Sequence, residues 1–162
     1  MYRRYDDLLS SPVNKQLNEL LTSILERYGF SVIEQDLRDI YVDNVVGVMN
    51  FAHKLVLLSQ NKSKELTMPE EFSHAMVRIA EAHPEVEELF TLTSLFESIK
   101  DTTLYKEVYE EYKDEYITEN KEVDEERVAR EALGKALATV LTTEYKEKYS
   151  SDANFFSKAK NA

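Results

Sequence analysis

The sequence contains no cysteine, and it has only three glycines, three prolines and three histidines in 162 residues. The lack of cysteine excludes disulfide scaffolds, Cys-ligated zinc and thiol nucleophiles. So few glycines and prolines argue against a turn-rich β protein and against a long disordered tract. The length and the 43% of hydrophobic residues suit one domain with one core. We expect that domain to span residues 1–150, followed by a polar tail at 151–162.

Basic residues are also scarce, because 20 Lys and Arg stand against 31 Asp and Glu, which gives a net charge of -11. This charge disfavours bulk attraction to nucleic acid or to anionic lipid. No apolar run approaches the length that spans a bilayer. The first residues, M-Y-R-R-Y-D-D-L-L, lack the apolar core and the cleavage site of a secretory signal. We therefore expect neither a nucleic-acid partner, nor a membrane, nor export by a signal peptide.

The N-terminal part of the chain predicts one helix and a small amount of β structure. Residues 12–28 place apolar side chains at helical spacing, and Gly29 is a suitable stop. Phe30 to Ile33 fits a short strand. Residues 45–59 are rich in β-forming side chains, and a turn at 50–54 would fold them into a hairpin.

The rest of the chain predicts helices, at 67–82, 84–99, 103–116 and 123–147. Thr67 is the expected N-cap of the first, and A-H-P at its end predicts a break, because a residue before proline avoids helical geometry. The fold class is therefore α+β and predominantly α-helical. A small hairpin or short sheet lies beside the helix that starts near Thr67, and three further helices follow.

The stretch E-E-F-S-H within that helix contains side chains that could bind a metal or act as a base. Glu70 and His74 lie one turn apart on one face, and Glu71 borders it. In H-E-x-x-H zinc helices the residues at i and i+4 bind the metal, and the glutamate at i+1 acts as general base. The same spacing also suits an ordinary acidic helix, in which Glu70, His74 and Arg78 form surface pairs. A metal site with an unusual ligand, an inactive relative of an enzyme and a plain acidic helix all remain open from this motif.

A family resemblance favours the first two readings. The stretch G-V-M-N-F-A-H-K-L-V-L-L-S-Q-N-K-S-K-E-L-T-M-P-E-E-F-S-H-A-M-V, residues 47–77, resembles the core of zincin-like metallopeptidase domains. In particular, it looks like those embedded in large virion-associated polyprotein-like proteins of tailed phages, including crAss-like phages. Residues 105–116 and 126–138 look like the downstream part of the same domains. The resemblance covers roughly residues 14–140 and implies a small α+β fold with a short sheet beside the zinc helix.

The resemblance implies a site made of Glu70 and His74 as metal ligands, with Glu71 as base for the attacking water. Active members have His where this chain has Glu70. A second carboxylate ligand would cancel more of the metal charge and slow hydrolysis. Zinc is the expected ion if one binds, although an oxygen-rich site also suits Mn or Ca.

The third ligand has two candidates. The family pattern E-A-L-G points to Glu131. Helical geometry instead places Glu125 near the middle of the main apolar face of the last helix, formed by Val128, Ala129, Ala132, Leu133, Ala136 and Val140. Glu131 lies away from that face, next to a second face of small residues, Gly134 and Ala138. We rank Glu131 before Glu125.

The function expected from these features is a zincin-like domain that has lost peptidase activity and serves as a structural or cargo module of a phage virion. Its partners would be virion proteins or a larger phage protein, and its location the virion or the host cytoplasm. One alternative is an active metal-dependent peptidase with a Glu/His/Glu site. Another is an acidic helical interaction module without a metal. The remaining histidines, His53 and His83, fit turn and helix-end positions, and four tyrosines between 105 and 116 share one helix face that fits a packing seam.

Overall fold

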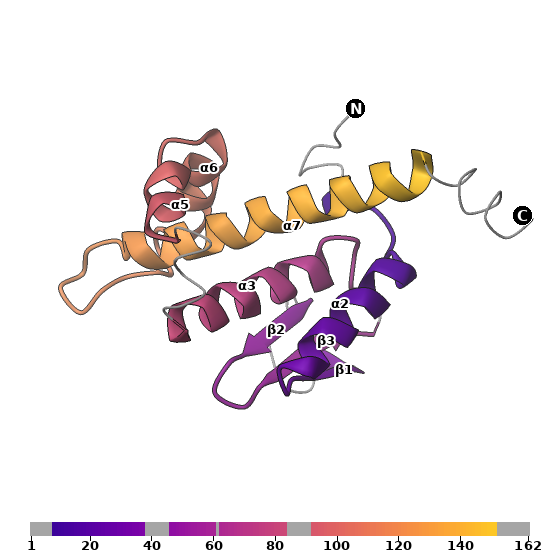
Figure 1. Cartoon of the computed structure of the whole chain (residues 1–162). Helices are drawn as coiled ribbons and strands as arrows, with labels where there is room; N and C mark the ends of the chain where they lie inside the picture. Colours follow the sequence, from indigo (N-terminus) through magenta and orange to yellow (C-terminus); the bar gives the residue numbers. More distant parts are fainter. Residues whose placement is uncertain (1–7, 38–45, 61, 84–91, 152–162) are drawn as a thin grey trace, which may run out of the picture.

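The computed structural model describes residues 8–37, 46–60, 62–83 and 92–151 (Figure 1). Its helices and strands form an α+β fold, mostly helical, with a small sheet and helices at the C-terminal end, as the sequence predicts. In chain order they are α2 (Lys15–Arg27), β1 (Ser31–Gln35), β2 (Gly47–Asn50), β3 (Leu55–Ser59), α3 (Thr67–Ala82), α5 (Leu92–Ile99), α6 (Thr103–Tyr112) and α7 (Glu125–Ser151).

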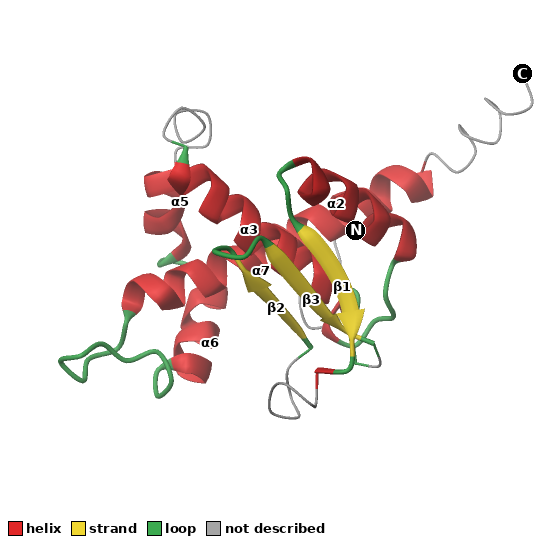
Figure 2. Cartoon of the chain, turned by 90° about the horizontal axis from the view of Figure 1, so that it is seen from below, coloured by secondary structure: helices red, strands yellow, loops and turns green. Residues whose placement is uncertain are grey.

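The sheet has three strands in the order β1-β3-β2 (Figure 2). Strands β2 and β3 form the predicted antiparallel hairpin, and Lys54 closes its turn with a φ of 49°. Strand β1 pairs parallel to β3, with Ile33 opposite Leu57. The sequence predicts β1 as a short strand but does not predict its parallel partner.

One face of the sheet is covered by α2 and α3. The main core lies between them, and its buried members are Leu17, Leu21, Leu25, Phe30, Val56, Leu58, Met68, Ala75 and Ile79. Helix α2 begins where the Asn14 side chain accepts a hydrogen bond from Leu17 N at 3.1 Å. It ends before Gly29, whose φ of 86° is readily adopted only by glycine.

The start of α3 differs from the prediction at Thr67. The helix begins at Thr67 itself, and the preceding residue, Leu66, offers no side-chain cap. The Thr67 Oγ1 accepts a hydrogen bond from Lys64 N at 2.9 Å, so this side chain fixes the entering loop instead. The predicted break is correct, because α3 ends at Ala82 and His83 caps it through backbone hydrogen bonds.

Helix α3 forms a middle layer, with the sheet and α2 on one side and the long helix α7 on the other (Figure 1). Helices α5 and α6 pack against the first part of α7. Their shared core contains Ile99, Val108, Val128, Ala129 and Ala132, and the tyrosines at 105, 109, 112 and 116 pack around it. The four tyrosines therefore form the predicted packing seam, but they do not share one helix face, because α6 ends at Tyr112 and Tyr116 follows in the next loop.

The helix limits differ from the sequence prediction at several points. Helix α6 ends at Tyr112 rather than at residue 116, and α7 extends to Ser151 rather than to residue 147. Val140 was predicted on the apolar face of α7, but 51% of it is exposed. The first part of the predicted helix at 84–99 and the tail from residue 152 lie outside the described residues.

Candidate functional site

The face of α3 that holds Glu70, Glu71 and His74 is turned toward α7 rather than toward water. The two helices meet closely at Gly134. A Cβ built on Gly134 would lie 2.6 Å from Nδ1 and 3.0 Å from Nε2 of His74, distances at which real Cβ atoms do not pack. The imidazole of His74 therefore occupies the space that a side chain at position 134 would fill.

Glu131 lies opposite His74. Its Oε2 atom is 3.5 Å from Nε2 of His74, and the side chains of His74 and Glu131 are 19% and 18% exposed. Position 131 is the one to which the family resemblance points. Glu125, the second candidate, is exposed in the first turn of α7. Glu125 acts on a different group: burial first, and then the charge of Glu125, raise the pKa of Tyr105 on α6.

Lys135 is the residue that the sequence analysis missed. Its Nζ atom lies 3.3 Å from Oε2 of Glu70 and 3.6 Å from Oε1 of Glu131, and only 8% of the side chain is exposed. The ammonium thus bridges the two carboxylates that the resemblance assigns as metal ligands. The signal was present in the sequence, because Lys135 follows Glu131 by one helical turn and is adjacent to Gly134.

The electrostatics of the cluster favour neutral forms of its two central groups. Burial, and then the charges of Glu70 and Glu131, raise the pKa of Glu71 to about 8, while Lys135 opposes this shift. Only about one Glu71 carboxyl in ten is then ionised at pH 7, by the ordinary titration relation. Burial also lowers the pKa of His74, with Glu131 raising it and Lys135 lowering it. At neutral pH we therefore expect a neutral imidazole beside a largely protonated Glu71.

Three members of the cluster, Glu71, His74 and Glu131, line a pocket of about 740 Å³. Its walls come from α3, from the start of α7 and from the end of β2 with the following turn. Strand β2 runs close to α3, because a Cβ on Gly47 would lie 3.0 Å from Cγ2 of Thr67 and 3.2 Å from Cγ of Glu71. The helix that contains His74 therefore has a strand beside it, and an acid from α7, Glu131, lies near that histidine.

The residues as they are arranged do not fit a zinc ion. In the described ranges, no three His, Cys, Asp or Glu side chains lie in positions that could hold a metal. The Lys135 ammonium lies between Glu70 and Glu131 and already provides both carboxylates with a positive charge. The other two histidines do not belong to this cluster. His53 is exposed in the β2–β3 turn, and His83 caps α3.

Comparison of the chain with known proteins gave no matching family model, no matching curated protein and no matching solved structure. In the part of the chain that the structure describes, no helix combines the length and the apolar character needed to cross a membrane.

Proposed function

We propose that the chain is a zincin-like domain without peptidase activity, in which the ammonium of Lys135 takes the place of the catalytic metal. The observation behind this proposal is the position of Lys135 Nζ, 3.3 Å from Glu70 and 3.6 Å from Glu131. A lysine that is 8% exposed needs such partners, because an unpaired buried charge is strongly destabilising. The two carboxylates in turn gain the cation that they would otherwise take from a metal.

An ammonium replaces the charge of a metal but not its chemistry. It cannot bind a water molecule as a Lewis acid and lower the pKa of that water, which is the step that makes a metal-bound nucleophile at neutral pH. The state of Glu71 is compatible with this view, because a carboxyl with a pKa of about 8 is mostly protonated at pH 7, and only the ionised minority could accept a proton from water. The ion pairs of Lys135 with Glu70 and Glu131 support a role of the cluster as a stabilising core element.

The biological setting follows from the resemblance. Residues 14–140 resemble domains of large virion-associated phage proteins, so we propose a structural or cargo role in a virion, through contacts with other proteins. A plain interaction module with no metal ancestry would leave Glu70 and His74 open to water with no acid opposite. Glu131 and Lys135 cover this face, which favours the zincin ancestry over that alternative.

A metal-dependent peptidase remains the second candidate, because one observation favours it. Glu71, His74 and Glu131 line an open pocket, and the pKa of Glu71 lies near the working range of a general base. This function requires the Lys135 side chain to leave the cluster, so that Glu70, His74 and Glu131 become free to bind an ion.

The deciding experiment is a measurement of metal content and zinc titration on the native chain, with a peptidase assay on casein in the same buffer. The proposal predicts no stoichiometric zinc and no zinc-dependent cleavage. Stoichiometric zinc that is lost in His74→Ala, together with cleavage that a chelator abolishes, would overturn it in favour of the second candidate.

A further inference from the structure

The pocket above the His74 cluster contains a group of arginines that the metal question does not explain. Arg78 on α3 and Arg127 and Arg130 on α7 all line it. Three arginines around one pocket are notable in a chain with a net charge of -11. These arginines differ in whether a neighbouring carboxylate neutralises them.

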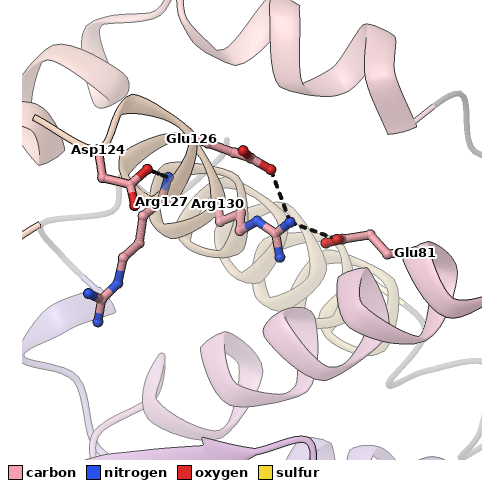
Figure 3. A network of polar contacts seen from close by, with 5 residues as sticks. All are labelled: Glu81, Asp124, Glu126, Arg127 and Arg130. Carbon is pink, nitrogen blue, oxygen red and sulfur yellow. Dashed lines mark hydrogen bonds and ion pairs between the residues drawn. The ribbon is translucent and has the colours of Figure 1, made fainter. Parts of the chain in front are cut away.

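Arg130 is neutralised. Its Nη2 atom lies 2.7 Å from Oε2 of Glu81 and 3.2 Å from Oε1 of Glu126, so this guanidinium joins α3 to α7 (Figure 3). The third acid of the same region, Asp124, uses its side chain to accept the backbone N–H of Arg127 at 3.1 Å, as an N-terminal cap of α7.

Arg127 and Arg78 have no such partner, since neither forms an ion pair with a carboxylate in the described part of the chain. The Arg127 side chain points away from Glu126 and Arg130 (Figure 3). Its guanidinium carbon lies 3.9 Å from the centre of the Tyr116 ring, and that of Arg78 lies 5.4 Å from the centre of the Phe51 ring. Stacking on an aromatic face orients a guanidinium and leaves its N–H edge open for a planar anion.

Among the described residues, the acidic side chains that line the pocket do not form ion pairs with Arg78 or Arg127. Glu131 pairs with His74 and Lys135, Glu126 pairs with Arg130, and Asp124 caps α7. Glu71 forms no ion pair with Arg78 or Arg127 in the part of the chain that the structure describes. The pocket therefore presents two oriented and uncompensated guanidinium groups.

We infer that this pocket binds a carboxylate attached to an apolar group, held between Arg78 and Arg127. Carboxylates match the planar fork of arginine, often through two parallel hydrogen bonds. Apolar side chains that also line the pocket, Met49, Phe51, Ala52 and Val77, suit an apolar neighbour of the carboxylate. A polyanion is disfavoured, because the overall charge is strongly negative. The terminal carboxylate of a peptide and that of a free organic acid share this chemistry.

The test is a titration of the ¹⁵N-labelled chain followed by NMR, in buffer with a chelator so that no metal contributes. The probes are N-acetylphenylalanine as a peptide-terminus mimic, 3-phenylpropionate as a simple acid, and 3-phenylpropanamide as the neutral control. We expect saturable shifts at pocket residues, with affinities of about millimolar for probes of this size. The amide should bind about tenfold more weakly, because it lacks a charge-assisted partner for arginine. Tighter binding of N-acetylphenylalanine than of 3-phenylpropionate would assign the site to a peptide terminus, and the reverse order to a free acid.

Variants identify the residues responsible. Arg78→Gln and Arg127→Gln should each weaken binding of the acids by about tenfold, on the same argument. Lys106→Gln, at an exposed position on α6 that does not line the pocket, should leave it unchanged. Equal binding of acid and amide, or unchanged affinity in both arginine variants, would overturn the inference. Phenyl phosphate binding more than tenfold tighter than the acids would also overturn it, in favour of a phosphate site. None of these outcomes depends on Lys135, so the inference and the proposed function can fail separately.

Discussion

The imidazole of His74 on α3 fills the space beside Gly134 on α7, where a Cβ would approach Nδ1 to 2.6 Å. This contact brings the two helices close enough for Glu131 and Lys135 to reach the side chains of α3. The buried polar cluster therefore depends on the absence of a side chain at one position in the middle of a long helix.

Replacing Gly134 with alanine tests that relationship. In a free helix, alanine is favoured over glycine by about 1 kcal/mol. Here the added methyl meets the His74 ring, and such overpacking costs about 1–3 kcal/mol, so we expect Gly134→Ala to lower the free energy of unfolding. In a His74→Ala background the ring is gone, and the same substitution should become stabilising by up to about 1 kcal/mol. Denaturant unfolding of the four proteins of this cycle measures the change of sign. A stabilising Gly134→Ala in the native background would contradict the close contact.

Removal of the Lys135 charge should lower the free energy of unfolding, because Lys135 is buried and both of its carboxylate partners are largely shielded from water. Lys135→Met keeps most of the length and an apolar stem but removes the cation that contacts Glu70 and Glu131. Breaking a buried pair on one side costs about 3–5 kcal/mol. Because these acids retain 15% and 18% exposure, we expect a loss near the lower end, about 3 kcal/mol at pH 7.

The matched control is Lys113→Met. Lys113 lies 2.7 Å from Oε2 of Glu110, closer than either contact of Lys135, but the two side chains are 40% and 68% exposed. Thermal and denaturant unfolding should show no measurable change for this variant, because exposed ion pairs contribute little. Equal losses in Lys113→Met and Lys135→Met would show that the buried cluster is not stabilised by its cation.

The raised pKa of Glu71 makes stability depend on pH in a definite direction. Between pH 4.5 and about 8, the folded chain keeps a proton on Glu71 that the unfolded chain has released. The contribution of this group is therefore fully present below pH 4.5 and is lost as the pH rises toward 8.

Glu71→Gln isolates this effect, since glutamine cannot ionise. Because the side chain lines a pocket that admits water, we expect less than the full linkage energy. At pH 8 the variant should be more stable than the native chain by on the order of 2 kcal/mol, and the two should be similar at pH 4.5. The measurement is the free energy of unfolding of the native chain and of Glu71→Gln between pH 4.5 and pH 8. A difference that does not change with pH would show that the pKa of Glu71 is not raised.

The two acids of α7 that the sequence offered as third ligands should behave differently. Glu131→Gln removes the charge that contacts both His74 and Lys135, and we expect a loss of about 1–3 kcal/mol, because the largely buried Lys135 keeps only Glu70 of its two carboxylate partners in this cluster. Glu125→Gln removes an exposed charge in the first turn of α7 and should cost at most about 0.5 kcal/mol, through the helix dipole. Unfolding at pH 7 compares the two, and a larger effect at Glu125 would contradict the placement of both residues.

Local patterns predicted much of this fold. The apolar spacing of α2, the hairpin of β2 and β3, and the helices after residue 67 all follow from periodicities and stops within a few residues of each other. The parallel pairing of β1 with β3 does not, because neither strand contains a signal for a partner more than 20 residues away. Thr67 is similar: its hydroxyl suits an N-cap, but a neighbouring loop N–H, that of Lys64, binds it instead.

In the candidate site, too, local features were predictable from the sequence, whereas contacts between distant segments were not. The sequence places Glu70, Glu71 and His74 on one face, since helical geometry requires it. It does not show that α7 covers this face, because that depends on packing between distant segments. Gly134 and Ala138 mark the second small-residue face of α7, and Lys135 lies between them. Since lysine is usually exposed, only the packing of α7 on α3 makes its role evident.

Zinc titration by calorimetry of the Glu70→His, Lys135→Met double variant shows whether Lys135 occupies the position of a former metal ion. This variant restores the missing histidine and removes the ammonium. If the account is right, it binds one zinc ion, the single variants bind less tightly or not at all, and adding His74→Ala abolishes binding. If the double variant is folded, as circular dichroism would show, and still binds no zinc, the cluster is not a former metal site and the account is contradicted.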